Sequence, residues 1–242
     1  MPLIMLNPYQ NVNPFVSSQG LVLAMDYDST TWKDSVNPTR TFSTTGSEAT
    51  QNTGRFINGT KSYRQVQAAA GRSGFLITPR TADLTFAGDF WFEMWAWTNG
   101  QGNTSFTGGD NWLIGYGRYA STGIGGIFLD DLKLTFGSAN GATSVTYVAQ
   151  SATAVTNNSW NHFAVGRKDG AVYLFVNGIM RASAAFTGTV GFDDNMGIGG
   201  FQDARITNGC YSGINGYIDR LRIYDTCLTT TNFTPLTSLY SA

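Results

Sequence analysis

Carboxylates are the residues to test first, because hydrolysis of a glycosidic bond needs two of them about 5 to 10 Å apart. The chain has only two glutamates, and they lie far apart in the sequence. Asp130 and Asp131 are adjacent, so an extended strand would send their side chains to opposite faces. Asp26 and Asp28 would share a face, but they lie where the first predicted strand ends, and a solvated turn is the simpler explanation. We therefore predict no catalytic residues.

The single histidine, His162, is the other candidate for catalysis or zinc binding. It stands among apolar and aromatic residues in an alternating segment, close to Trp160. That position is typical of a structural histidine whose ring is buried and satisfied by its neighbours. The residues that could carry chemistry thus indicate a protein that is not an enzyme.

Sugar binding requires an exposed aromatic ring with hydrogen-bonding groups nearby. The most aromatic segment of the chain places Trp91, Glu93, Trp95 and Trp97 on one face of a strand. A carboxylate among three indoles indicates a partly polar surface, and Trp112 lies in the next predicted strand. We therefore predict a carbohydrate-binding site at Trp91, Glu93, Trp95 and Trp112. Packing between two sheets is the alternative explanation for the same rings.

These side chains must be positioned by strands, and the clearest strand pair is a hairpin at residues 159–178. Residues 160–168 alternate and are largely apolar, and residues 171–176 form the second strand. Asp-Gly at 169–170 and Asn-Gly at 177–178 supply the positive φ angles of tight hairpin turns. Apolar side chains on both faces of the second strand indicate that it is covered on each side, within a large antiparallel β-sandwich.

The rest of the chain shows the same short alternating runs, and Asn-Gly occurs six times. This pattern is typical of all-β proteins, and no window has a convincing helical period, so very little helix is expected. A hairpin is predicted at residues 55–66, turning at Asn58-Gly59. Further strands are predicted at residues 21–27, 89–98, 112–116, 126–130, 132–136, 144–149, 182–186, 196–198 and 216–224.

Composition excludes several classes of partner. Lys plus Arg number 15 against 16 for Asp plus Glu, so no overall field attracts nucleic acid. No apolar run is long enough to span a bilayer, so membrane insertion is not expected. The apolar N-terminal residues lack a basic region and are interrupted by proline, which is not the pattern of a secretion signal. We expect a protein made in the cytoplasm.

Three segments carry a family resemblance. They are LTFAGDFWFEMW at residues 84–95, WNHFA at 160–164 with LFVNG at 174–178, and GYIDRLRIY at 216–224 followed by Leu228. In order and spacing this set resembles the laminin-G-like domains of the concanavalin A-like lectin/glucanase superfamily. The resemblance implies a jelly roll of two stacked, curved antiparallel sheets over residues 21–242. Its core would contain or adjoin Trp160, Val172, Leu174, Val176, Leu221 and Ile223.

The resemblance also implies a bound ion, and it supplies a glucanase motif to look for in the chain. Calcium is the usual ion of this family, held at the rim by loop oxygens, and the residues that would bind it here are Asp110, Asp193 and Asp194. Ordinary Asx-turns are the alternative explanation for these aspartates. The Glu-x-Asp-x-x-Glu motif of the superfamily's glucanases is absent from the chain.

Residues 1–20 look like an extended arm that precedes the domain. Three prolines exclude a helix or a central strand there, although the segment is rich in apolar residues. An exposed apolar stretch usually marks an interaction site, so we predict docking against another structural chain, either a second copy or a virion shell protein. The alternative is that the arm folds back over its own domain. The predicted docking residues are Leu3, Ile4, Leu6, Tyr9 and Phe15.

These observations favour a non-enzymatic recognition or adhesion module on the surface of a virus particle. A phage decoration or fibre protein that binds a host-surface glycan is the leading hypothesis. A glycoside hydrolase of the same fold and a purely structural capsid cement protein are the alternatives, since one fold hosts many functions. The hydrolase requires a facing pair of carboxylates, the lectin requires exposed rings without that pair, and the cement protein requires neither.

Overall fold

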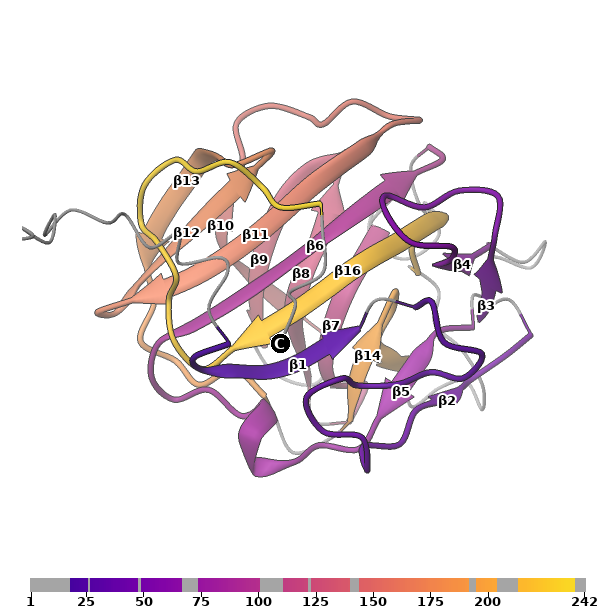
Figure 1. The fold of residues 1–242 in the computed structure, drawn as a ribbon. Coiled ribbons are helices and arrows are strands. Elements are labelled where there is room, and N and C mark those ends of the chain that lie inside the picture. The colour runs from indigo at the N-terminus through magenta and orange to yellow at the C-terminus, as the bar shows by residue number, and fades with distance from the viewer. Residues whose placement is uncertain are drawn as a thin grey trace, which may run out of the picture.

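The computed structural model describes residues 18–25, 27–47, 49–66, 74–100, 111–121, 123–139, 144–191, 195–203 and 213–237. These residues form two stacked sheets, a front sheet and a back sheet as seen in Figure 1. The front sheet has the order β13-β12-β11-β6-β16-β4-β3, and β1 also pairs with β16. All of its pairings are antiparallel. Its strands are β1 (Leu21–Met25), β3 (Ala49–Asn52), β4 (Ser62–Gln65), β6 (Phe90–Thr98), β11 (Trp160–Lys168), β12 (Ala171–Val176), β13 (Ile179–Ala185) and β16 (Gly216–Tyr224).

The back sheet has the order β10-β9-β8-β7-β14-β5-β2, and the short strand β15 adds a parallel pairing to β7. Its strands are β2 (Ser43–Thr44), β5 (Leu76–Thr78), β7 (Asn111–Tyr119), β8 (Gly123–Asp130), β9 (Lys133–Ala139), β10 (Val145–Gln150), β14 (Met196–Ile198) and β15 (Gln202–Asp203). One 3-10 turn, η2 (Ala82–Leu84), is the only helical element in the described ranges. No helix there is long and apolar enough to cross a membrane. The predicted all-β jelly roll is confirmed.

The main core lies between the sheets and follows from strand alternation. In β6 the residues Phe90, Phe92 and Met94 point inward, and apolar residues of the paired strands β11 and β16 join them. Leu174 in β12 and Leu221 in β16 are fully buried in the same cluster. Burying side chains of this size contributes about 1.5 to 3 kcal/mol each. This core therefore decides which face of each strand turns inward.

The outer face of the front sheet carries a second layer over part of its area. Trp91, Phe175 and Tyr224 alternate with core residues, and Phe233 and Leu236 of the C-terminal segment pack against them. In Figure 1 this yellow segment follows β16 and passes over the left part of the front sheet. It explains why β12 is apolar on both faces, as the sequence indicated.

The two hairpin turns also form as predicted. Asp169 and Gly170 have φ angles of 49° and 78°, and Asn177 and Gly178 have 52° and 75°. Gly178 has a second reason to lack a side chain, since a Cβ there would lie 2.0 Å from the carbonyl oxygen of Phe233. Its own carbonyl accepts a hydrogen bond from the Phe233 N–H at 2.9 Å. The turn therefore also holds the C-terminal segment in place.

Two predictions are wrong in detail. No hairpin forms at residues 55–66, because Asp28 accepts the backbone N–H groups of Thr60 and Lys61, and only β4 remains to pair with β3. Trp160 lies outside the shared core, because it has the strand parity of His162 and Ala164 rather than that of the inward-facing Phe163. Of the predicted arm at residues 1–20, residues 1–17 lie outside the described residues.

Core packing predicts a contrast between two positions of the same hairpin. Leu174→Ala removes a fully buried side chain and should lower the free energy of unfolding by about 2 to 5 kcal/mol. Ile179→Ala is the matched control, because Ile179 is 41% exposed and its loss should cost well under 1 kcal/mol. Urea unfolding followed by tryptophan fluorescence measures both. Equal losses in the two variants would contradict the assignment of faces.

Candidate functional site

A row of aromatic side chains crosses the outer face of the front sheet. Trp160 in β11 pairs with Trp97 in β6, and Trp97 pairs with Tyr217 in β16. The next strands continue the line, because Tyr217 pairs with Arg64 in β4 and Arg64 pairs with Thr50 in β3. Directly paired residues point to the same face, so the five side chains stand side by side. With strands about 4.8 Å apart, the line is roughly 19 Å long.

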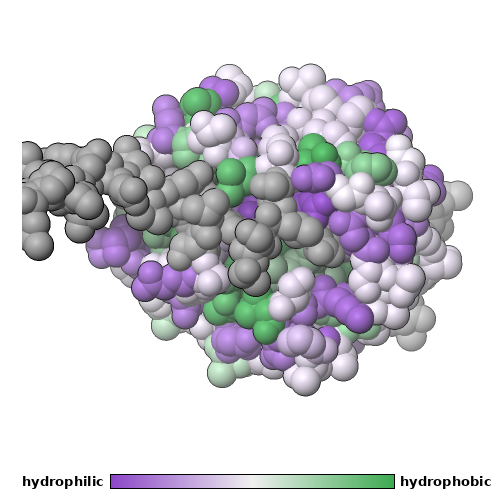
Figure 2. Space-filling model, viewed as in Figure 1, coloured by the Kyte–Doolittle hydropathy of each residue, from purple (hydrophilic) through white to green (hydrophobic). Residues whose placement is uncertain are grey.

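The aromatic row, defined as Trp160, Trp97 and Tyr217, is half-buried and not covered by the second layer. The Trp97 and Trp160 ring centroids lie 6.2 Å apart at 77°, and those of Trp160 and Tyr217 lie 6.5 Å apart at 55°. The Arg55 guanidinium lies 3.7 Å from the Trp97 ring centroid and 5.4 Å from that of Tyr217. Figure 2 shows this face as a mixture of polar and apolar residues. Such a surface suits an amphipathic ligand.

Loops rich in asparagine border the row where β6 ends. The side-chain oxygen of Asn157 accepts the N–H of Gly100 at 2.7 Å, and the Asn215 side chain donates to the carbonyl of Asn99 at 3.0 Å. The backbone N–H of Asn158 donates to the carbonyl of Thr98 at 2.9 Å. These bonds hold three loops together beside the aromatic row. Their remaining amide groups can serve as donors and acceptors for hydroxyl groups.

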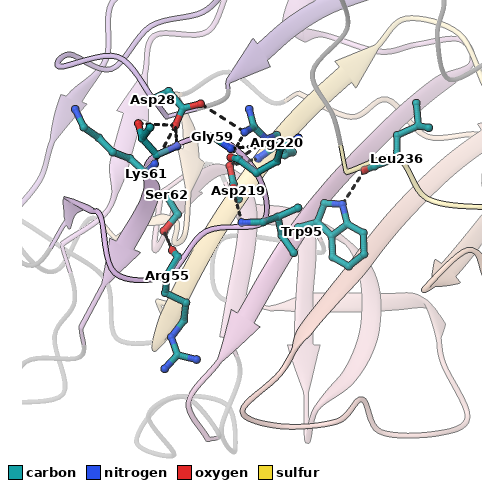
Figure 3. A network of polar contacts seen from close by, with 12 residues as sticks. Asp28, Arg55, Gly59, Lys61, Ser62, Trp95, Asp219, Arg220 and Leu236 are labelled. Carbon is teal, nitrogen blue, oxygen red and sulfur yellow. Dashed lines mark hydrogen bonds and ion pairs between the residues drawn. The ribbon is translucent and has the colours of Figure 1, made fainter.

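Arg55 owes its position to a β-bulge in β16. The register shifts between Asp219 and Arg222, and Arg220 has a φ of 54° there. The Arg220 guanidinium consequently reaches the loop before β4, where it donates to the carbonyl of Asn58 and lies 3.4 Å from an oxygen of Asp28. Figure 3 shows this network with Arg55 at its lower end.

Asp219 of β16 holds the loop before β4 in place. It accepts the N–H groups of Ile57 and Arg220, each at 2.8 Å, and its side chain is fully buried. Burial raises the pKa of Asp219 to about 7, although these backbone N–H groups and the Arg220 guanidinium act to lower it. Ser62 completes the anchoring, because its hydroxyl donates to the carbonyl of Arg55 at 2.5 Å.

Glu93, a second carboxylate on this face, is also engaged in structural contacts. Glu93 is 1% exposed, lies 2.9 Å from the Arg222 guanidinium and is 3.5 Å from His162 Nε2. Burial alone would raise the pKa of Glu93, but Arg222 and His162 together hold it below its usual range. His162 is buried against Trp95 and Phe233, so the predicted burial of its ring is confirmed.

The four predicted sugar-binding residues do not form one exposed surface. Trp91 is fully buried between Phe175 and the C-terminal segment, and Glu93 is buried beside it on β6. Trp112 lies in the back sheet, 1% exposed, stacked on Phe128 at 4.5 Å. The expected platform is therefore wrong for these three side chains, because layers outside each sheet cover them.

Trp95 is the predicted residue closest to the aromatic row. It shares a face with Trp97 two residues along β6, is half-buried, and donates its indole N–H to the carbonyl of Leu236 at 2.9 Å. A role for Trp95 in binding stays a prediction. Trp160 and Tyr217 were missed as site residues, because only the register between strands places them beside Trp97. Their strand parity was the one available signal.

The calcium prediction at Asp110, Asp193 and Asp194 falls outside the described residues and stays a prediction. Within the described ranges, no group of three or more His, Cys, Asp or Glu side chains could hold a metal ion. The neighbouring Asn111 is engaged in structure, since its side chain accepts the N–H of Asn215 at 3.1 Å and donates to Gly100.

The raised pKa of Asp219 predicts a pH-dependent stability. The folded chain holds the Asp219 proton with a pKa of about 7, against an ordinary value of 3.8, so the folded state binds that proton more tightly. This contribution to stability is full below pH about 4 and falls as pH rises towards 7, by at most about 1.4 kcal/mol per pH unit.

Asp219→Asn removes the titrating group, so the difference in unfolding free energy between wild type and variant should change across this window and stay constant above it. Urea unfolding at intervals from pH 4 to pH 8 measures that difference. A constant difference throughout would mean that Arg220 keeps Asp219 ionised in the folded chain.

Comparison with known proteins places this geometry in a family. The model of the Laminin_G_3 family, described as concanavalin A-like lectin/glucanases superfamily, matches residues 61–232. No curated protein matches the chain. Domain 4 of AbnA, a GH43 extracellular arabinanase from Geobacillus stearothermophilus solved with arabinotriose, is similar with a TM-score of 0.65 at 16% identity. The alignment covers 86% of this chain and 94% of that domain.

Two toxin domains share the fold. The binding domain of Paraclostridial Mosquitocidal Protein 1 has a TM-score of 0.63 at 15% identity, and the binding domain of botulinum neurotoxin serotype G has 0.60 at 10%. The alignments cover 87% and 86% of this chain but only 50% and 48% of those chains. The family match extends over most of the chain and the solved structures share its two-sheet fold, so this chain belongs to the concanavalin A-like lectin/glucanases superfamily.

Proposed function

We propose that this chain is a non-enzymatic recognition module that binds an oligosaccharide across the outer face of the front sheet. The observation that carries the proposal is the aromatic row, three half-buried rings held in register by neighbouring strands. Aromatic rings offer apolar faces to the C–H side of a sugar, and nearby polar groups bond its hydroxyls. Strand pairing holds the rings in place before binding, which reduces the entropy lost on association.

The carboxylates favour binding over hydrolysis. Glu93 is ion-paired with Arg222, and both oxygens of Asp219 accept backbone N–H groups. A glycosidase needs two carboxyl groups that reach the substrate, one as acid and one as nucleophile or base. The raised pKa of Asp219 is the one feature that favours the alternative of a glycoside hydrolase, since a general acid must hold its proton near neutral pH. Its burial argues against that role.

Similar structures give independent support. The arabinanase domain was solved in complex with arabinotriose, and the two toxin domains are named as binding domains. At 16% identity or less these likenesses concern the fold, so the ligand of this chain has to be argued from its own residues.

Substitution in the aromatic row tests the proposal. Trp160→Ala and Tyr217→Ala should each weaken binding to any oligosaccharide that the wild type retains by about tenfold or more, the equivalent of about 1.4 kcal/mol. Tyr147→Ala is the matched control, because Tyr147 is an exposed tyrosine of the back sheet. Affinity electrophoresis over a panel of polysaccharides, followed by calorimetry, gives the dissociation constants.

Two results would contradict this function. Unchanged binding in both row variants would place the ligand elsewhere. Release of reducing ends from a bound polysaccharide, abolished by Asp219→Asn, would support the hydrolase instead.

We further propose that the module is displayed on a virion surface as a phage decoration or fibre protein, with residues 1–20 docked on a neighbouring structural chain. Its support is the apolar, proline-rich composition of that segment. The capsid cement protein is the alternative, and it needs no glycan.

Deletion of residues 2–18 tests the docking arm. The shortened chain should stay folded, because the described sheets begin at Leu21, and it should no longer join the particle or oligomer. Circular dichroism and size-exclusion chromatography with light scattering give the two readouts. Assembly that survives the deletion, or a domain that unfolds, would contradict an anchoring role.

A further inference from the structure

We infer that the ligand of the aromatic row is an anionic oligosaccharide, and that Arg55 and Arg64 bind its carboxylate or sulfate groups. The inference rests on the proposed function and adds the chemical class of the ligand. It starts from the position of these two arginines. Arg64 stands next to Tyr217 in the line across the sheet, and the Arg55 guanidinium lies over Trp97.

Among the residues that the structure describes, neither arginine has an ion-pair partner. Within the described part of the chain, no carboxylate lies within ion-pairing distance of Arg55 or Arg64. Arg40, Arg220 and Arg222 show the contrast, since each of them pairs with a buried or partly buried carboxylate. Figure 3 shows the Arg55 guanidinium directed away from the network that holds its backbone.

The Arg55 side chain is nevertheless built into a defined position. Cation–π contact with Trp97 orients its plane, and a guanidinium stacked on a ring keeps its N–H donors free at the edges. The Ser62 hydroxyl holds its carbonyl, and Asp219 holds the N–H of Ile57 two residues later. A cation ordered in this way loses little entropy when it binds an anion.

The charge at the row is local and not a property of the whole chain, whose formal net charge is −1. Glu93 and Asp219, which lie on the outer face of β6 and β16, are 1% and 0% exposed, and the partly exposed Asp28 is paired with Arg220. Arg55 and Arg64 are half-buried, so the charge that the row presents to solvent is positive. Guanidinium groups bind carboxylate and sulfate through paired N–H···O bonds. Rings for the sugar and cations for its acidic groups therefore occur together.

The test compares polysaccharides that share a backbone and differ in charge. Polygalacturonate and its methyl ester test for carboxylate binding, and dextran sulfate and dextran test for sulfate binding. Calorimetry or affinity electrophoresis is carried out on the full chain as wild type, Arg55→Gln, Arg64→Gln and Arg55→Lys. Arg181→Gln is the matched control, since Arg181 is an exposed arginine at the far edge of the front sheet.

We expect the wild type to bind the charged member of at least one pair about tenfold or more tightly than the uncharged member. Arg55→Gln and Arg64→Gln should lose this preference, Arg55→Lys should keep part of it, and Arg181→Gln should keep all of it. Added salt should weaken the charged member selectively. The pair of polysaccharides that shows this preference identifies the acidic group as a carboxylate or a sulfate. Thermal unfolding of each variant checks that the fold is intact.

Three outcomes would overturn the inference. Equal affinity for both members of each pair, with Trp160→Ala still abolishing binding, would leave the proposed function standing and remove the anionic class. Binding to charged polymers that persists in Trp160→Ala and is matched by single-stranded DNA would indicate nonspecific attraction of polyanions. Failure to bind any polysaccharide, charged or neutral, would overturn the proposed function as well.

Discussion

Antiparallel pairing of β6 with β11 on one side and β16 on the other is the constraint on which the rest of the structure depends. A strand alternates its side chains, so the register decides which residues enter the core and which stand on the outer face. Shifting β6 by one residue would put Trp97 between the sheets and Ala96 outside. Burial of Phe90, Phe92 and Met94 opposes that shift. The aromatic row is thus a consequence of how the core is packed.

The outer face of the front sheet has a covered part and an uncovered part. One part is closed by the C-terminal segment, whose Phe233 covers Trp91 and Phe175. Beside it, Glu93 and Arg222 are buried as an ion pair next to His162, which is tolerable because the opposite charges lie within contact distance. The remaining part carries Trp97, Trp160 and Tyr217 without such a cover. Closure of one half limits where a ligand can lie on the other.

The bulge in β16 connects the covered and the uncovered parts of this face. The one extra residue of β16 between Asp219 and Arg222 lets Asp219 accept a hydrogen bond from the loop before β4, while Arg222 lies beside Glu93. In a regular strand, residues three apart point to opposite faces, so Asp219 and Arg222 could not both make these contacts. The bulge therefore positions Arg55 over Trp97 from a loop that has no regular structure of its own.

The sequence by itself determined the fold class, the central hairpin and most strands, because alternation and Asp-Gly or Asn-Gly turns are local signals. It also determined that His162 is buried, since its neighbours are apolar and aromatic. Only the tertiary structure decided which tryptophans remain accessible. Trp91 and Trp97 have the same parity on one strand, yet a segment from the C-terminal end of the chain covers the first and leaves the second half-exposed. The partners of Trp97 come from strands distant in sequence, and no local pattern specifies the register that sets Trp160, Tyr217 and Arg64 in one line.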